Sequence, residues 1–148
     1  MDYQIIPMTK DHVAQIAELE KRCFSDPWSE TSIASELDNP LSLWFVAEQS
    51  GTVLGYVGSQ SVLDEADMMN IAVCPEARRQ GIALALVEAL ERALRHKGVI
   101  ALTLEVRASN LPAKTLYEKI GFSEVGRRKN YYYHPTEDAC ILKKEWSL

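Results

Sequence analysis

Two stretches of the sequence combine residue types that can do chemistry, and the first reads NIAVCPEARRQGIA over residues 70–83. An apolar strand leads here through a tight loop into a helix, where backbone N–H groups and the positive end of the helix dipole favour an anion. Gly81 lets the backbone approach a ligand closely, and Arg78 and Arg79 can neutralise its charge. The stretch indicates a phosphate or pyrophosphate cradle, although it is neither a P-loop nor a Rossmann fingerprint. The alternative is a polar loop that caps a helix.

The second stretch places a carboxylate and a tyrosine on consecutive elements. Residues 104–110 read LEVRASN, a strand that ends in an Asn-containing turn, and a helix carrying Tyr117 follows. In strand alternation Glu105 shares a face with Thr103 and Arg107, opposite to the apolar residues. Because Glu is seldom buried in a central strand without a partner, Glu105 is a functional candidate, as is Tyr117. The alternatives are that Glu105 pairs with Arg107 or another cation, and that Tyr117 is a core aromatic.

Cysteines, histidines and other aromatic residues give weaker signals. The three cysteines form no CxxC pair and the three histidines lie far apart in sequence, which supports neither a disulfide framework nor a sequence-local zinc site. Cys74 adjoins the cradle, but no histidine lies near it in sequence to activate it for covalent catalysis. The run Tyr131–Tyr133 either packs a sheet edge or lines a peptide groove, and Trp28 is interpreted as substrate-side or core packing. The basic stretch 127–129 is interpreted as a solvated face.

Hydropathy patterning predicts the elements that must position these residues. Extended segments are expected at residues 3–7, 43–48, 52–63, 68–73, 101–107, 125–133 and 139–146. Helices are expected after Thr9, from Ser29 to about residue 39, over 81–97 and over 111–120. This order predicts an α/β fold with a mixed sheet, and one domain over residues 1–148 because no linker interrupts the pattern.

Composition excludes several classes of protein. The chain has 148 residues, of which 47% are apolar and 25% charged, as expected for one globular domain. The formal charge of −5 argues against nucleic acid or an anionic membrane as the main partner. Residues 1–12 do not resemble a signal peptide, and no apolar run approaches the ~20 residues of a membrane span. The sequence therefore predicts a soluble protein of the reducing cytoplasm.

The motif RRQGIA at residues 78–83 resembles the Q/R-x-x-G-x-G/A signature of the GNAT family of N-acetyltransferases. NIAV before it, and LEVRASN and LYEKIGF after it, make the resemblance specific and extend it over nearly the whole chain. It reaches the subgroup that acetylates protein N-termini, which the segments FSDPWS (24–29), LDEA (63–66) and RKNYY (128–132) also resemble. Arg78 and Ala83 stand where near relatives often have Gln and Gly, and the general signature allows both.

The resemblance implies the GNAT fold, a mixed and mostly antiparallel sheet of six to seven strands flanked by four helices. Its parallel central strands would splay apart around acetyl-CoA, the cosubstrate, and no metal would be needed. Backbone groups of residues 71–73 would hold the acetyl and pantetheine part, with the Val73 N–H directed to the thioester oxygen. Residues 79–84 would wrap the pyrophosphate, and Asn110 would bind the pantetheine arm. The implied binding residues are Ile71, Ala72, Val73, Arg79, Gln80, Gly81, Ile82, Ala83, Leu84 and Asn110.

The resemblance also implies roles in the chemical step. Glu105 would be the general base, acting through a water, and Tyr117 the acid that protonates the departing thiolate. The partner would be a protein N-terminus, that of ribosomal protein S18 with its alanine, and neither nucleic acid nor membrane would be bound. Trp28, Tyr131 and Tyr132 would line the peptide groove. Two other functions remain open: acetylation of a small amine or a lysine, and a non-catalytic acyl-CoA-binding module that regulates a partner.

Overall fold

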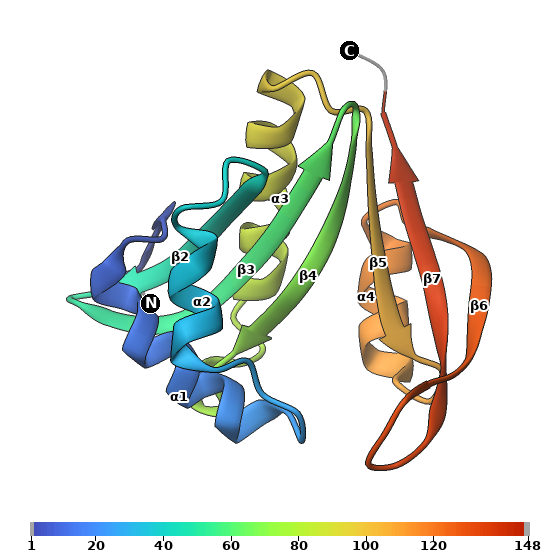
Figure 1. Ribbon diagram of the computed structural model, residues 1–148, viewed down its shortest axis with the longest axis horizontal. Helices are drawn as coiled ribbons and strands as arrows, with labels where there is room; N and C mark the ends of the chain where they lie inside the picture. The colour runs from blue at the N-terminus through green and yellow to red at the C-terminus, as the bar shows by residue number, and fades with distance from the viewer. Residues whose placement is uncertain (1, 147–148) are drawn as a thin grey trace.

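The computed structural model describes residues 2–146, which form one mixed sheet of seven strands with helices on both of its faces (Figure 1). The strands are β1 (Gln4–Pro7), β2 (Ser42–Gln49), β3 (Thr52–Val62), β4 (Glu65–Val73), β5 (Ala101–Arg107), β6 (Ser123–Tyr132) and β7 (Glu137–Glu145). The helices are α1 (Val13–Cys23), α2 (Glu30–Glu36), α3 (Ile82–His96) and α4 (Leu111–Lys119), with short 3₁₀ helices η1 (Lys10–His12) and η2 (Pro75–Ala77). Among these described residues, no helix has the length and apolar character needed to cross a membrane.

The strand order in space is β1-β2-β3-β4-β5-β7-β6, and β4 with β5 is the one parallel pair of this sheet in the described chain. That pair is short: Glu65–Asp67 lies beside Ala101–Thr103, and beyond it the two strands diverge (Figure 1). The mixed, mostly antiparallel sheet with splayed parallel central strands confirms the fold class expected from the sequence.

Each face of the sheet has its own apolar core. On the face covered by α3 and α4, called the α3–α4 face, α3 buries a stripe at helical spacing that includes Leu86, Leu90 and Leu94. On the opposite, α1–α2 face, Ile16 and Ile33 pack from the two helices onto β2, β3 and β4. Because both faces of β3 are covered, its residues 53–59 are buried without interruption.

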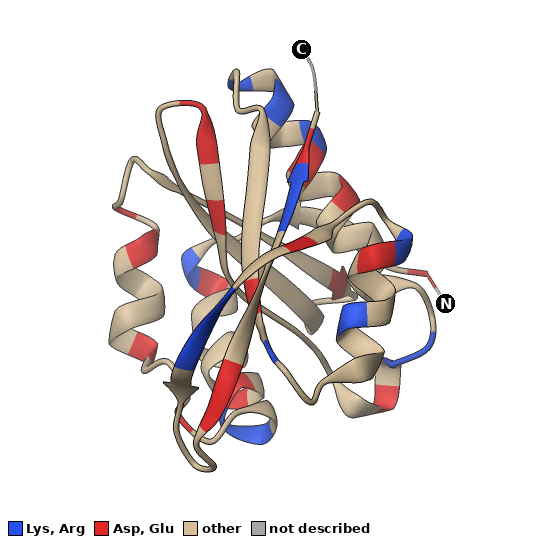
Figure 2. Ribbon diagram, turned by 90° about the vertical axis from the view of Figure 1, so that its right-hand side faces the viewer, with Lys and Arg blue, Asp and Glu red and all other residues tan. Residues whose placement is uncertain are grey.

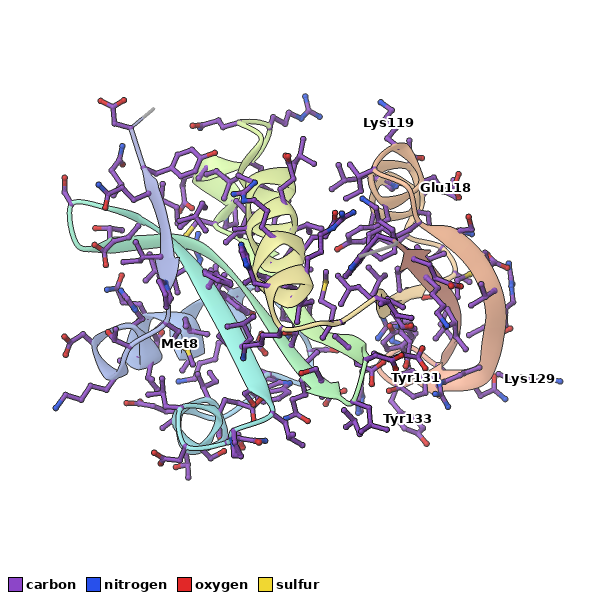
Figure 3. All side chains as sticks on the ribbon, turned by 90° about the horizontal axis from the view of Figure 1, so that it is seen from above. Met8, Glu118, Lys119, Lys129, Tyr131 and Tyr133 are labelled. Carbon is purple, nitrogen blue, oxygen red and sulfur yellow. The ribbon has the colours of Figure 1, made fainter. Side chains whose placement is uncertain are left out.

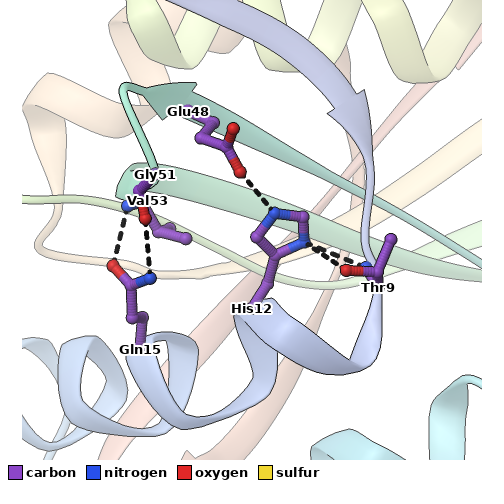
Figure 4. A network of polar contacts seen from close by, with 6 residues as sticks. All are labelled: Thr9, His12, Gln15, Glu48, Gly51 and Val53. Carbon is purple, nitrogen blue, oxygen red and sulfur yellow. Dashed lines mark hydrogen bonds and ion pairs between the residues drawn. The ribbon is translucent and has the colours of Figure 1, made fainter.

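A polar network anchors the start of α1 to the β2–β3 hairpin (Figure 4). The backbone N–H of Thr9 donates to Nδ1 of His12 at 2.9 Å, and His12 Nε2 lies 2.7 Å from Glu48 Oε2. Gln15 accepts from the Val53 N–H at 2.9 Å and donates to a hairpin carbonyl at 3.0 Å. These bonds fix the position of α1 against the sheet.

Several element boundaries differ from those expected by a few residues, as in α2, β6 and β7, and two of the differences lie at α1 and β4. The helix expected after Thr9 begins as η1, and α1 itself starts at Val13. β4 begins at Glu65, three residues before the expected start at Met68. The hydropathy pattern did not predict these three residues as strand, because two of them, Glu65 and Asp67, are charged. The earlier start matters, since it is this segment that pairs with β5.

Candidate active site

The end of β4 presents backbone groups on the side away from β3. Cys74 donates its N–H to the Leu54 carbonyl at 2.7 Å. Because hydrogen-bonded pairs alternate along an antiparallel ladder, the N–H of the preceding Val73 points away from β3, toward the side from which β5 has diverged. The Val73 carbonyl accepts from Arg78 Nε at 3.2 Å. This geometry can supply an N–H donor to a ligand that lies between the two strands.

The loop that joins β4 to α3 has two residues with positive φ. Arg79 has φ 64° and Gly81 has φ 77°, and α3 begins directly afterwards at Ile82. Left-handed residues interspersed in a turn direct successive N–H groups toward one side, which forms an anion-binding concavity. A Cβ on Gly81 would meet no atom within 4 Å, so space lies open at this point. Positive φ at two residues, a helix start and open space at Gly81 are compatible with an anion cradle, which stays a prediction.

Glu105 is held by a cation other than its strand neighbour. Its Oε1 lies 3.4 Å from Nε of Arg128 on β6, while its Oε2 is buried and accepts no hydrogen bond from the described residues. Arg107 is occupied elsewhere: it donates to the carbonyls of Tyr133 and Pro135, at 2.8 Å each. Of the two alternatives for a paired Glu105, the structure selects another cation, Arg128.

The role of Arg128 was missed by the interpretation of residues 127–129 as a solvated face. In Figure 3 Lys129 projects outward from the β6–β7 edge, in keeping with that interpretation, whereas Tyr131 lies toward the half of the sheet that holds β4. Arg128 reaches Glu105 and also lies over the Tyr131 ring, 5.6 Å from its centroid. Because adjacent residues of a strand point to opposite faces, strand alternation could have separated Arg128 from Lys129.

Tyr117 is a core aromatic of the α3–α4 face. It is 5% exposed and packs edge-on against Phe122, with ring centroids 5.6 Å apart. Burial, with a smaller contribution from Tyr132, raises the pKa of the Tyr117 hydroxyl to about 12. The hydroxyl is therefore protonated at neutral pH. Asn110 is exposed at the start of the same helix, where its Oδ1 caps α4 by accepting from the Ala113 N–H at 3.2 Å.

The expected groove residues fall into two groups. Tyr131 and Tyr132 stack edge-to-face at 5.1 Å, and Arg107 lies 4.6 Å from the centroid of the Tyr132 ring. Burial, followed by the nearby Glu105 carboxylate, raises the pKa of both tyrosines, that of Tyr132 to about 12. Trp28 instead packs edge-on against the buried Trp44 on the α1–α2 face, at 5.6 Å.

Charge around the site is mixed. Asp67 faces the same side of the sheet as Glu105, because it lies opposite Thr103 in the parallel pair. Burial, and then the negative charge of Glu105, raises the pKa of Asp67. Figure 2 shows basic residues interspersed with acidic ones on the side formed by β5, β6 and β7. Within residues 2–146, no three His, Cys, Asp or Glu side chains are grouped closely enough to hold a metal ion.

Comparison with known proteins identifies the family. The model of the acetyltransferase (GNAT) family matches residues 13–122. The [ribosomal protein bS18]-alanine N-acetyltransferase of Escherichia coli K12 is 46% identical over 128 residues, which span 84% of each chain. The enzyme of that name from Salmonella typhimurium is 42% identical over 130 residues, 84% of this chain and 85% of its own.

A solved structure gives the same result. The crystal structure of the ribosomal-protein-S18-alanine N-acetyltransferase from Escherichia coli superposes with a TM-score of 0.91 and 39% identity, covering 99% of this chain and 96% of its own. The resemblance carried by RRQGIA at residues 78–83 is thereby confirmed at the level of family and fold. The chain belongs to the acetyltransferase (GNAT) family.

Proposed function

We propose that this acetyltransferase transfers the acetyl group of acetyl-CoA to the N-terminal amine of a protein, with the N-terminal alanine of ribosomal protein bS18 as its substrate. The observation that carries the proposal is the 46% identity with the Escherichia coli enzyme named for that reaction, over 84% of each chain. A ribosomal protein as substrate implies action in the cytoplasm, on a protein partner and without a requirement for nucleic acid or membrane.

The residues expected to hold acetyl-CoA fit its chemical groups. The Val73 N–H, directed away from β3, supplies a donor for the thioester oxygen, where negative charge develops during acyl transfer. Residues 79–84, which comprise the positive-φ turn and the first residues of α3, offer N–H groups and a helix N-terminus to the pyrophosphate. Asn110 uses its Oδ1 as a helix cap, so its amide NH₂ remains as a donor for the pantetheine arm.

Glu105 and Tyr117 divide the proton transfers between them. Acetyl-CoA supplies an acetyl group whose carbonyl carbon is attacked by the substrate amine. The buried Oε2 of Glu105, which the described residues leave without a hydrogen bond, accepts the amine proton through a water. The C–S bond breaks as the amide forms, and the protonated hydroxyl of Tyr117 donates to the departing thiolate sulfur.

An α-amine suits this arrangement better than a lysine does. An α-amine has a pKa of about 7.7–8.0 and a lysine about 10.4, so roughly a tenth of the former and less than a thousandth of the latter is the free base at pH 7. A single carboxylate acting through water then has one proton to remove from a nucleophile that is already neutral. We assign the residues after the N-terminus to a groove lined by Tyr131, Tyr132 and Trp28.

A competition assay at pH 7 tests the function. Three peptides are offered with acetyl-CoA: one with a free N-terminal Ala, one with a blocked N-terminus and internal lysines, and one with a free, bulky N-terminal residue. Acetylation, followed by mass spectrometry, is expected on the first peptide with strong preference. Equal reaction of the blocked lysine peptide would replace the proposal by the lysine or small-amine alternative. Binding of acetyl-CoA without transfer to any amine would favour the non-catalytic module.

A further inference from the structure

A carboxylate lies in the apolar core between α1 and the sheet. Glu20 is 1% exposed, one helical turn after Ile16 on the buried stripe of α1. A charged side chain in such a place is costly unless hydrogen bonds satisfy it. Neither the acetyl-CoA residues nor the proton-transfer residues described above include it.

Three donors from three different elements converge on Glu20. The backbone N–H of Trp28, in the segment between α1 and α2, donates to Oε1 at 2.9 Å. The hydroxyl of Tyr56 on β3 and the side-chain amide of Asn70 on β4 both donate to Oε2. Every partner is a donor, so the position requires a group with two acceptor atoms. Burial raises the pKa of Glu20, and the same three hydrogen bonds oppose that rise.

Asn70 stands at an irregularity of β4. Gly58 lies opposite Asn70 and Ser59 lies opposite Met68, so Met69 is an extra residue and the strand has a β-bulge there. While its amide nitrogen donates to Glu20, Asn70 accepts with Oδ1 from the N–H of Ile71 at 3.1 Å. The side chain thus links Glu20 to the backbone of the residue that opens the acetyl-CoA segment 71–73.

We propose that Glu20 is a positioning residue that couples the Trp28 loop, on the peptide side, to the acetyl-CoA segment 71–73. Through Trp28 it fixes the loop on the peptide side, and through Asn70 it fixes the bulge that sets the backbone of residues 71–73. The inference rests on the proposed function, because that function assigns peptide binding to the Trp28 loop and acetyl-CoA binding to residues 71–73. Glu20 touches neither reactant and acts through the two segments that do.

Glu20→Gln tests the coupling with little change of shape. A glutamine has one acceptor oxygen, so its NH₂ group must face either the Trp28 N–H, which cannot accept, or the Asn70 amide, which can accept only by giving up the bond from the Ile71 N–H. Loss of one charge-assisted bond is expected to raise the peptide KM about tenfold and to lower kcat. Acetyl-CoA affinity is expected to fall by a smaller factor, because the loop before α3 holds acetyl-CoA together with residues 71–73.

Glu36→Gln is the matched control. Glu36 is also a buried carboxylate, and it accepts from Trp44 Nε1 at 3.1 Å and from Gln60 Nε2 at 3.0 Å. These hydrogen bonds join α2 to β2 and β3, and none of them is made to the Trp28 backbone or to β4, although Trp44 packs edge-on against the Trp28 ring. This variant is expected to lose stability and to keep its KM and kcat values. Equal kinetic changes in both variants would reduce Glu20 to a structural core residue and overturn the proposal.

Amide hydrogen exchange separates this inference from the proposed function, because it needs no peptide. Acetyl-CoA binding at β4 is expected to slow exchange at the Trp28 amide in the native chain and in Glu36→Gln, and this effect should disappear in Glu20→Gln. If the transmitted protection persists in Glu20→Gln, the coupling is wrong even where acetylation of the Ala peptide succeeds. If the native chain fails to acetylate that peptide but the transmission is lost as expected, the function fails and the coupling stands.

Asn70→Ala provides a second route should Glu20→Gln not fold. Asn70 is half-buried, so its truncation removes the β4 end of the link with less cost to the core. The Trp28 N–H keeps its bond to Glu20 in this variant, and the protection that acetyl-CoA transmits to it should nevertheless be lost. Retention of that protection would overturn the proposal.

Discussion

Glu105 on β5 and Arg128 on β6 form an ion pair, 3.4 Å between Oε1 and Nε, across the intervening strand β7. The register explains the reach. On β7, Ile141 lies opposite Glu105 and Ala139 lies opposite Arg128, so Glu105 and Arg128 are offset by two residues across this strand. The small side chain of Ala139 leaves room for the long Arg128 side chain to reach Glu105 diagonally. One carboxylate oxygen is oriented by this pair, and the other faces inward without a partner among the described residues.

Glu105→Gln is therefore expected to retain the fold and lose the base. The amide has the same shape and can still contact Arg128, but it cannot accept a proton from the amine. Steady-state kinetics should show kcat/KM reduced by about 10²–10⁴-fold, with acetyl-CoA affinity unchanged.

Glu124→Gln is the control for Glu105→Gln. Glu124 is an ion-paired glutamate of β6, 3.5 Å from Arg127 and 3.7 Å from Lys114. Glu124 is not among the residues proposed to bind acetyl-CoA or to transfer protons, so the activity of Glu124→Gln should match that of the native chain. Full activity in Glu105→Gln would assign the carboxylate to its structural pair with Arg128 alone.

Tyr117→Phe is expected to lower kcat by about 10²–10⁴-fold, because it removes the proposed acid and nothing else. The ring contact with Phe122 survives, so thermal unfolding and acetyl-CoA binding should be close to native. Pre-steady-state measurement is needed to establish that the chemical step limits kcat. Native kcat under that condition would make Tyr117 a core aromatic only.

Local sequence patterns predicted the parts of the site whose function depends on neighbours in the chain. The RRQGIA motif, residues 78–83, is the turn and helix start that follow β4, and its glycine directly precedes the first residue of α3. The alternation around Glu105 likewise placed its side chain on the face opposite to Leu104.

The contacts that orient these groups could not be predicted in the same way. Arg128 meets Glu105 only because the sheet order places β7 between β5 and β6. Glu20 meets Asn70 only because α1 docks onto β4. The sequence did carry a signal for Glu20, because this carboxylate lies four residues after Ile16, on the apolar stripe of α1. A carboxylate buried at such a position needs hydrogen-bond or charge partners.

Gly81→Val is expected to abolish acetyl-CoA binding while the chain still folds. A β-branched residue strains a backbone at φ 77°, and its side chain would occupy the open space in the cradle where the ligand approaches. Gly98→Val is the matched control, since Gly98 has φ 83°, also has no atom within 4 Å of a built Cβ, and lies beyond the other end of α3. Calorimetric titration with CoA should separate the two variants, and equal affinities would exclude the cradle.

The buried Tyr117 hydroxyl also predicts how stability changes at alkaline pH. Its pKa is about 12 in the folded chain, raised from 10.0 chiefly by burial, so the folded state retains the proton that the unfolded chain releases near pH 10. This contribution to stability is complete below pH 10 and is lost as the pH rises through about 12. Between pH 9 and pH 11 the free energy of unfolding should fall by about 1 kcal/mol on account of Tyr117. Urea unfolding of Tyr117→Phe across this range should show a decline that is shallower by that amount. Tyr132 is unchanged in both proteins, so its own titration cancels from the comparison, and parallel declines would mean that the Tyr117 hydroxyl ionises as freely as in the unfolded chain.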